Sequence, residues 1–266
     1  MYERSPFDLT GLKGLVTGCG DPNGIGFATA RMLLGLGARV FITSTSGRIY
    51  DRAAELHSTR TAVDAGVADL TNPDEARAIV EQAATDGLDF VVNNAGMTSI
   101  SRDAYSKGES AGIEGISIEG WHAALDRNLD TALNVTHFAL PHLKVSTSGR
   151  IVFVSSVTGP VMAMPHEVAY ATAKAGLVGM ARSVALDVAH YNITANCVLP
   201  GWITTGSQTA AEMNEGNATP LKRNGTPTEI ASVLAWLCSR SASYITGQAI
   251  VVDGGNSIRE MRGEDI

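Results

Sequence analysis

The chain has little of what would suit it to nucleic acids or to membranes. Its 266 residues include 20 Lys and Arg against 27 Asp and Glu, which gives a formal net charge of −7. Nucleic-acid binding needs concentrated basic side chains, so we expect no nucleic-acid partner. No apolar run approaches the roughly 20 residues that a membrane helix requires, so we expect no membrane span.

Cysteine is scarce as well. Cys19, Cys197 and Cys238 are far apart, odd in number and without the paired spacing of a metal site, which indicates a reducing compartment. The first eight residues are too polar for a secretory signal peptide. We therefore expect a cytoplasmic protein with no metal site.

Short apolar runs alternate with longer helical patterns along the chain. The predicted strands are Leu12–Thr17, Arg39–Thr43, Thr61–Val67, Leu88–Val92, Arg150–Ser155, Ile193–Leu199 and Gln248–Val252. The predicted helices lie around 25–36, 73–85, 120–143, 168–190 and 227–239. This alternation predicts an α/β fold, a doubly wound parallel sheet of about seven strands with helices on both faces. No linker divides residues 1–266, which we interpret as a single domain.

Two polar segments interrupt this alternation, Met97–Gly120 and Trp202–Arg223. Loops of such length in a compact domain are usually functional or mobile. Both follow predicted strands, and ligands of such folds bind at the carboxyl ends of the strands. We expect the two segments to border a ligand site, although decorated surface loops remain an alternative.

A glycine-rich turn follows the first predicted strand and precedes a helix. It contains Gly18, Gly24, Ile25 and Gly26. Glycines at such a turn let the backbone approach a pyrophosphate, and the helix N-terminus supplies N–H donors. The sequence therefore predicts a dinucleotide site here; the alternative is a tight strand–helix turn without a ligand.

The end of the second predicted strand bears on the choice of cofactor. An acid at this point would bind the ribose hydroxyls of NAD, but the sequence has Ser44, Thr45 and Arg48 instead. Hydroxyls and a guanidinium suit a 2′-phosphate, so NADP(H) is favoured over NAD(H). Arg48 as a solvated surface residue is the alternative.

Two further strand ends are candidate cofactor contacts. Asp69 and Leu70 follow the third predicted strand, where the Asp69 carboxylate could accept from an adenine amino group or help to cap the next helix. Asn94, Ala95 and Gly96 close the fourth, where glycine permits close approach of a cofactor.

Tyr170 and Lys174 are four residues apart in a predicted helix, so the phenol and the ammonium share one face. A nearby cation stabilises phenolate, so we expect Lys174 to lower the pKa of Tyr170 toward neutral pH. Tyr170 is thus a candidate proton donor or acceptor.

These motifs together resemble the short-chain dehydrogenase/reductase family over about the whole chain. The residues that carry the resemblance are Thr17-Gly18, Gly24-Ile25-Gly26, Asn93–Gly96, Asn128, Ser156, Tyr170, Lys174 and Pro200-Gly201. The tail from Pro220 to Gly255 is similar to the 3-oxoacyl-acyl-carrier-protein reductases. The resemblance implies a Rossmann-like fold and NAD(P)-dependent interconversion of a ketone and a secondary alcohol.

The resemblance also implies a role for each matching residue. Tyr170 would be the acid/base, Lys174 would lower its pKa and bind the nicotinamide ribose, and Ser156 would bind the substrate oxygen. Asn128 would hold a water that links Lys174 to solvent. Ile203, which follows Pro200 and Gly201, would place backbone groups against the nicotinamide carboxamide, with Thr205 nearby.

The chain departs from the family pattern at several points. Asp21 and Pro22 make the glycine turn two residues longer, so its phosphate cradle is expected to be reshaped. Thirteen residues separate Ser156 from Tyr170, one more than is common, so 162–168 is expected to bulge over the substrate. Ser155 is the alternative to Ser156 if the register differs.

The segments on the substrate side also differ in length from those of the carrier-protein reductases. The segment after Gly96 is about ten residues longer, and the loop after Gly201 is shorter. Both changes fall where the substrate is expected to enter. They leave the identity of the substrate undetermined, whereas the predicted hydride chemistry does not depend on them.

Alternative functions remain. The polar segments Ser99–Ser117 and Thr204–Thr219 suit a catabolic dehydrogenase of a sugar or other polyol. A non-catalytic NADP-binding sensor or scaffold is the alternative from another class, against which the presence of Tyr170 and Lys174 argues. The small residues of 169–185 suggest a homotetramer or homodimer, or a close fit of this helix to its own sheet.

Overall fold

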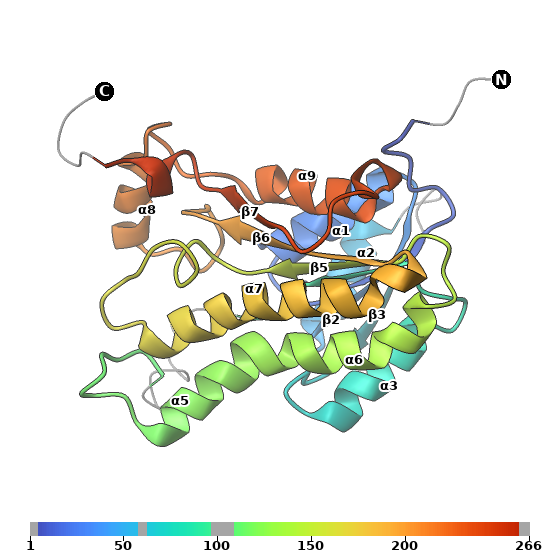
Figure 1. The fold of residues 1–266 in the computed structure, drawn as a ribbon, viewed down its shortest axis with the longest axis horizontal. Coiled ribbons are helices and arrows are strands. Elements are labelled where there is room, and N and C mark those ends of the chain that lie inside the picture. Colours follow the sequence, from blue (N-terminus) through green and yellow to red (C-terminus); the bar gives the residue numbers. More distant parts are fainter. Residues whose placement is uncertain (1–4, 58–62, 97–108, 261–266) are drawn as a thin grey trace.

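The computed structural model describes residues 5–57, 63–96 and 109–260. Seven strands form one sheet in the order β3-β2-β1-β4-β5-β6-β7, with every neighbouring pair parallel (Figure 1). The strands are β1 (Lys13–Val16), β2 (Arg39–Ser44), β3 (Val63–Val67), β4 (Phe90–Asn93), β5 (Arg150–Val154), β6 (Thr194–Pro200) and β7 (Ala249–Val252). The predicted α/β fold class, a Rossmann-like doubly wound sheet of seven strands, is confirmed.

Helices cover both faces of the sheet (Figure 1). One face carries α1 (Ile25–Gly35), α2 (Arg48–Leu56) and α9 (Pro227–Cys238). The other carries α3 (Pro73–Ala83), α6 (Thr131–Leu143) and α7 (Val168–Val188), with α5 (Ile118–Leu125) packed against α7. This arrangement leaves the carboxyl ends of the strands, and the loops that follow them, as the open edge where ligands bind in such folds.

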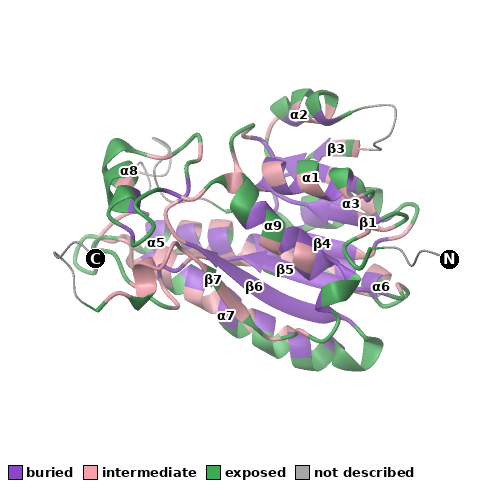
Figure 2. Cartoon of the chain, turned by 90° about the horizontal axis from the view of Figure 1, so that it is seen from above, coloured by how far each residue is buried: buried purple, intermediate pink, exposed green. Residues whose placement is uncertain are grey.

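The strands are buried because alternate residues enter two separate apolar cores. In β4, Phe90 belongs to the core under α1 and α9, whereas Val91 belongs to the core under α3, α6 and α7. Ile151 and Val152 divide in the same way in β5, whose five residues are all buried. Figure 2 shows the central strands as a buried layer. Burial on both faces explains their continuous apolar sequence.

The predicted helix 120–143 is two helices, α5 and α6, with a single π-helical turn at Asp126–Asp130 between them. The first begins at Ile118, where the Ser117 hydroxyl accepts from the backbone N–H of Gly120. A π turn inside an α-helix is rare and occurs frequently at functional sites. It contains Asn128, one of the predicted site residues.

Among the described residues, two α-helices were not predicted. Helix α2 starts at Arg48, itself one of the candidate phosphate-binding residues. Helix α8 (Ala210–Asn217) occupies the middle of the polar segment 202–223 and begins with a capping box between Thr209 and Glu212. Most of the α8 side chains are exposed, so it lacks the apolar stripe by which helices are recognised in a sequence.

Residues 58–62 and 97–108 are outside the described residues. The start of the predicted strand Thr61–Val67 and the first half of the predicted segment Met97–Gly120 therefore lie outside the described residues. In the described ranges, no helix is both long and apolar enough to span a bilayer.

Candidate active site

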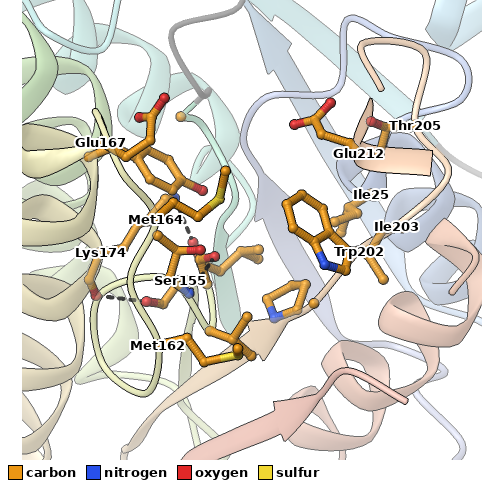
Figure 3. A pocket seen from close by; sticks show the side chains of 18 of the residues that line it. Ile25, Ser155, Met162, Met164, Glu167, Lys174, Trp202, Ile203, Thr205 and Glu212 are labelled. Atoms are coloured by element: carbon orange, nitrogen blue, oxygen red, sulfur yellow. Dashed lines mark hydrogen bonds between the residues drawn. The ribbon is translucent and has the colours of Figure 1, made fainter. Parts of the chain in front are cut away.

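A cavity of about 450 Å³ opens at the carboxyl ends of β5 and β6, beside the N-terminal half of α7 (Figure 3). It brings together many of the predicted site residues, namely Ile25, Asn94, Gly96, Ser156, Tyr170, Lys174, Pro200, Gly201, Ile203 and Thr205. These residues come from five parts of the chain, and only the fold makes them neighbours.

Lys174 lies at the inner end of this group, with 5% of its surface exposed. Its Nζ donates a hydrogen bond to the carbonyl oxygen of Val154 at 3.1 Å and lies 5.6 Å from the centre of the Tyr170 ring. Burial lowers the pKa of Lys174 to about 8, because desolvation penalises the ammonium. The predicted proximity of phenol and amine on one face of the helix is therefore present.

Tyr170 differs from the sequence-based expectation in its acidity. Burial raises the pKa of the phenol to about 12. Hydrogen bonding with Ser156 opposes that rise, whereas the carboxylates of Glu167 and Glu212 add to it. The prediction that Lys174 lowers this pKa toward neutral is wrong for this arrangement, because desolvation of the phenolate is the largest effect.

Ser155 and Ser156 are distinguished by their hydrogen bonds. The buried Ser155 hydroxyl donates to the backbone carbonyl of Lys174 at 2.7 Å, so its one proton is used within the protein. Ser156 is less buried, lines the cavity, and its oxygen accepts from the backbone N–H of Thr158 at 3.1 Å. Ser156 is thus the serine beside the phenol, in the register first expected.

Asn128 lies behind the cavity wall, 2% exposed. Its amide nitrogen donates to the carbonyl of Ala124 at 3.1 Å. A methyl group placed on Gly96 would lie 3.0 Å from Asn128 Oδ1 and 3.3 Å from Lys174 Nζ. Asn128 and Lys174 therefore both lie close to Gly96, although Asn128 does not itself line the cavity.

The glycine turn is fastened to the end of β4. The Thr17 hydroxyl oxygen accepts from the backbone N–H groups of Asn94 and Ala95, at 3.0 and 2.8 Å. In return, the Asn94 amide donates to the carbonyls of Thr17 and Gly18, at 3.0 and 3.1 Å. Gly18 has a φ of 72°, which favours glycine. These bonds hold the turn at the point where the strand order reverses.

The N-terminus of α1 fits an anionic cofactor group. In the described part of the chain no side chain caps this helix at Gly24, and its first turn has no acid. By contrast, α3, α8 and α9 each have a capping side chain and an acid there. The first N–H groups of α1 thus remain donors for a pyrophosphate. Gly24, Ile25 and Gly26 would hold it.

Arg48 lies against the glycine turn, since a methyl group placed on Gly20 would be 2.8 Å from its Nε and 3.1 Å from Ser44 Cβ. Arg48 and Thr45 are exposed, whereas Ser44 is buried and its hydroxyl donates to the carbonyl of Ser46 at 3.0 Å. An exposed guanidinium beside the turn fits a phosphate on the adenosine ribose. Of the two predicted hydroxyls, the Thr45 side chain is the one open to solvent.

Asp69 and Leu70 are not brought to the cavity. The Asp69 carboxylate accepts from the backbone N–H and the hydroxyl of Thr71, at 3.0 and 2.8 Å, and so closes the turn before α3. The Leu70 side chain is 4% exposed and belongs to the apolar core. A cofactor could reach only the backbone of Leu70, whereas Asp69 remains exposed at the end of β3.

The longer glycine turn reaches a different loop. A methyl group placed on Gly206 would lie 2.6 Å from Asp21 Oδ2, so the inserted Asp21 touches the segment that follows β6. The Asp21 carboxylate also accepts from the backbone N–H of Asn23 at 2.9 Å, which fixes its direction. The expected reshaping of the cradle is therefore a contact between its insertion and the loop at the substrate side.

Several lining residues were not singled out from the sequence. They are Met162, Met164, Glu167, Trp202, Gln208, Glu212 and Asn256. In Figure 3, Glu167 and Glu212 lie on opposite sides of one end of the cavity, and Met162 lies at the other end. We call Gly96, Ser156, Tyr170 and Lys174 the floor of the cavity, and Glu167 and Glu212 its mouth. In the residues described, no three His, Cys, Asp or Glu gather as a metal site.

Comparison with known proteins identifies relatives along nearly the whole chain. The family model described as enoyl-(acyl carrier protein) reductase matches residues 18–257. Nodulation protein G of Rhizobium sp. is 37% identical over 258 residues, which cover 94% of this chain and 98% of the relative. The 3-oxoacyl-[acyl-carrier-protein] reductase FabG of Chlamydia trachomatis is 34% identical over 255 residues, 93% of this chain and 98% of the relative.

A solved structure agrees with these sequence matches. The crystal structure of a short-chain type dehydrogenase/reductase from Mycobacterium marinum superposes with a TM-score of 0.86 at 27% sequence identity. The match covers 95% of this chain and 98% of the other. The same arrangement of strands and helices thus extends over both chains.

Proposed function

The chain belongs to the short-chain dehydrogenase/reductase family and is an oxidoreductase of CH–OH and C=O groups, and we propose that it uses NADP(H) to interconvert a ketone and a secondary alcohol. The observation that carries this proposal is the convergence of Ser156, Tyr170 and Lys174 on one cavity, with the Ser155 hydroxyl engaged elsewhere. The 3-oxoacyl reductase among the relatives makes a ketone reductase the first candidate.

The cofactor would lie along the open edge of the sheet. Gly18, Gly24 and Gly26 would admit its pyrophosphate, and Asn94 to Gly96 would border its nicotinamide half. Pro200, Gly201, Ile203 and Thr205 would face the carboxamide from the other side. When bound, the nicotinamide supplies or accepts the hydride. The preference for the phosphorylated form is supported by the position of Arg48 beside Gly20.

The proton in this reaction belongs to Tyr170. A phenol with a pKa of about 12 is fully protonated at neutral pH and can donate to the oxygen of a ketone as negative charge develops there. Ser156, beside the phenol, would donate a second hydrogen bond to the same oxygen. In the reverse direction, Tyr170 must first lose its proton in order to accept one from the alcohol.

Lys174 and Asn128 would return the proton that Tyr170 gives away. Lys174 has a pKa of about 8, so both its charged and neutral forms exist near neutral pH. Asn128 and Lys174 both lie close to Gly96, and an ordered water between them would connect the ammonium to solvent. We assign Asn128 a positioning role, because it does not touch the cavity.

Exposed leucines on two helices bear on the assembly of the protein. Leu133 on α6 and Leu186 on α7 are 50% and 81% exposed on neighbouring helices. Together with the small residues of α7, they support a homodimer or a homotetramer built on this helical face. Size-exclusion chromatography with light scattering gives the number of subunits directly.

The proposed function is tested by following NADPH and NADH oxidation with a panel of simple ketones, hydroxyketones and β-ketoacyl thioesters. We expect turnover with at least one ketone and a higher kcat/KM for NADPH than for NADH. A failure of every ketone, in both directions of reaction, would contradict the reductase proposal. A preference for NADH would contradict only the cofactor assignment.

A polyol dehydrogenase is the second candidate. The observation in its favour is the polar side of the cavity, where Thr205, Ser207 and Gln208 line the wall together with the two glutamates. Hydroxyl-bearing substrates are recognised by such hydrogen-bonding groups. Oxidation of polyols with NADP⁺, measured beside the ketone panel, separates the two candidates.

A further inference from the structure

The mouth of the cavity has a charge that the proposed hydride chemistry does not use. Among the lining residues that the structure describes, Glu167 and Glu212 are acidic and Lys174 is the one base. The Lys174 ammonium is bound to the Val154 carbonyl at the floor. The cavity wall therefore offers a substrate two carboxylates, whereas the Lys174 ammonium is already engaged by the backbone.

Glu167 is held in place by the part of the chain that is longer than the family pattern. The Ser110 hydroxyl donates to Glu167 Oε1 at 2.8 Å. The adjacent Glu109 is 2% exposed and accepts from Arg127 Nη1 at 2.8 Å. Arg127 precedes Asn128 in the π turn, so the ion pair ties residues 109–110 to the rigid helical layer.

A second contact joins the same two segments. A methyl group placed on Gly112 would lie 3.2 Å from His166 Nδ1, so the His166 imidazole lies against the backbone of Gly112. His166 has a φ of 66°, a conformation uncommon for residues other than glycine. The segment after β4 thus contacts the residues before α7, where the chain has one residue more than the family pattern, and these two departures meet beside Glu167.

Glu212 is fixed from the opposite side. Its Oε2 accepts from the backbone N–H and the hydroxyl of Thr209, at 2.7 and 2.9 Å, in the capping box of α8. Both glutamates raise the pKa of Tyr170, so both carboxylates act on the phenol at the reacting end of the cavity. Two separately held carboxylates therefore lie on opposite sides of the cavity, and both act electrostatically on the phenol that would bind the substrate oxygen.

We propose that Glu167 and Glu212 select substrates that carry a hydrogen-bond donor, a hydroxyl or an ammonium group, and no negative charge beside the reacting carbon. This inference rests on the proposed ketone–alcohol interconversion. Carboxylates accept strong hydrogen bonds from hydroxyl and ammonium groups. They repel an anion more strongly in a partly dry cavity than in water.

The experiment uses four secondary alcohols that differ in one group. They are 2-butanol, 1,2-propanediol, protonated 1-amino-2-propanol and 3-hydroxybutyrate, in which a methyl, hydroxyl, ammonium or carboxylate group replaces the variable end. Oxidation of each is measured with NADP⁺ as kcat/KM. For an alcohol that is turned over too slowly, its Kd for the complex of protein and NADP⁺ is measured by calorimetry instead.

The variants are Glu167→Gln and Glu212→Gln, with Glu215→Gln as the matched control. Glutamine keeps the shape of the side chain and can still complete the capping box of α8, so only the charge is removed. Glu215 lies exposed on the same helix as Glu212 and does not line the cavity. It tests whether any loss of negative charge nearby has the same effect.

For the unaltered protein, we expect the hydroxyl or the ammonium compound to be preferred over 2-butanol, and 3-hydroxybutyrate to be the poorest. A leading hydroxyl compound identifies neutral polyhydroxylated substrates, and a leading ammonium compound identifies amino alcohols. Each glutamine variant should raise kcat/KM for 3-hydroxybutyrate relative to 2-butanol by about tenfold, the size expected for loss of one close charge repulsion. The Glu215 variant should leave this ratio unchanged.

Equal or better use of 3-hydroxybutyrate by the unaltered protein, or an unchanged ratio in both glutamine variants, would overturn the inference and leave the hydride chemistry standing. Absence of hydride transfer with all four alcohols and with the ketone panel would instead refute the proposed function, and the inference would fall with it.

Discussion

The floor and the mouth of the cavity are built by different means. The floor residues Ser156, Tyr170 and Lys174 come from the end of β5 and from α7, where the apolar core fixes the backbone. The mouth residues Glu167 and Glu212 precede α7 or lie on α8, and side-chain contacts of loops hold them. The comparison teaches that the sheet positions the chemistry, whereas the departures in loop length shape what is admitted.

The largest effect that sharpens this comparison concerns the two serines of the floor. We expect Ser156→Ala to lower kcat by about 10²-fold, because one donor to the developing oxyanion is lost. Ser155→Ala should leave kcat nearly unchanged and lower the free energy of unfolding by about 1 kcal/mol, since a buried hydrogen bond is removed. Steady-state kinetics and urea denaturation of both variants test this expectation. The reverse pattern would show that Ser155, and not Ser156, binds the substrate oxygen.

The next effect lies at the far end of the cofactor site. We expect Arg48→Ala to lower kcat/KM for NADPH by about tenfold or more and to leave that for NADH nearly unchanged, because a phosphate contact is lost. Arg39→Ala is the control, since Arg39 stands at the opposite end of β2, paired with Asp86. Equal loss with both cofactors would mean that Arg48 does not recognise the 2′-phosphate.

A pH profile connects the mouth to the floor. Burial and the two carboxylates raise the pKa of Tyr170 to about 12, so phenolate becomes more abundant as the pH rises from neutral. Alcohol oxidation should therefore speed up with pH, while ketone reduction, which needs the phenol, should not. In Glu212→Gln the rise in oxidation should begin at lower pH. An unchanged pH profile in Glu212→Gln would mean that the charge of Glu212 does not influence the pKa of Tyr170.

The smallest effect is expected from the loss of the hydrogen bond between Ser110 and Glu167. In Ser110→Ala, Glu167 keeps its charge but loses the hydrogen bond that directs one of its oxygens. We expect only about a twofold to threefold change in kcat/KM for hydroxylated substrates, in line with loss of one modest hydrogen bond. A larger fall that also reached 2-butanol would indicate that residues 109–117 support the floor as well.

The same contrast explains what could be predicted from the sequence. The seven strands and the main helices follow from periodicity. Tyr170 and Lys174 follow from their spacing of four residues in a helix, and Ser156 follows from the resemblance to the family. These elements depend on local patterns and on burial against one sheet. The strand order brings these residues together at the carboxyl ends of the strands, where such folds bind their ligands.

The individual side chains of the mouth could not be predicted, although residues 162–168 and 202–223 were expected beside the ligand, because their placing depends on contacts between distant segments. Nothing in the local sequence joins Ser110 to Glu167, or Asp21 to Gly206. Helix α8 was missed because its side chains are largely exposed, and with it the placing of Glu212. The acidity of Tyr170 was misjudged because a sequence shows a neighbouring charge but not the desolvation that outweighs it.

The central claim is that Tyr170 carries the proton of hydride transfer. Single-turnover oxidation of bound NADPH by a ketone substrate, in the unaltered protein and in Tyr170→Phe, tests it most directly. We predict a loss of about 10²–10⁴-fold in the rate constant with the Kd of NADPH nearly unchanged, because phenylalanine keeps the ring and removes only the acid. A Tyr170→Phe variant that retains most of the rate would contradict the account.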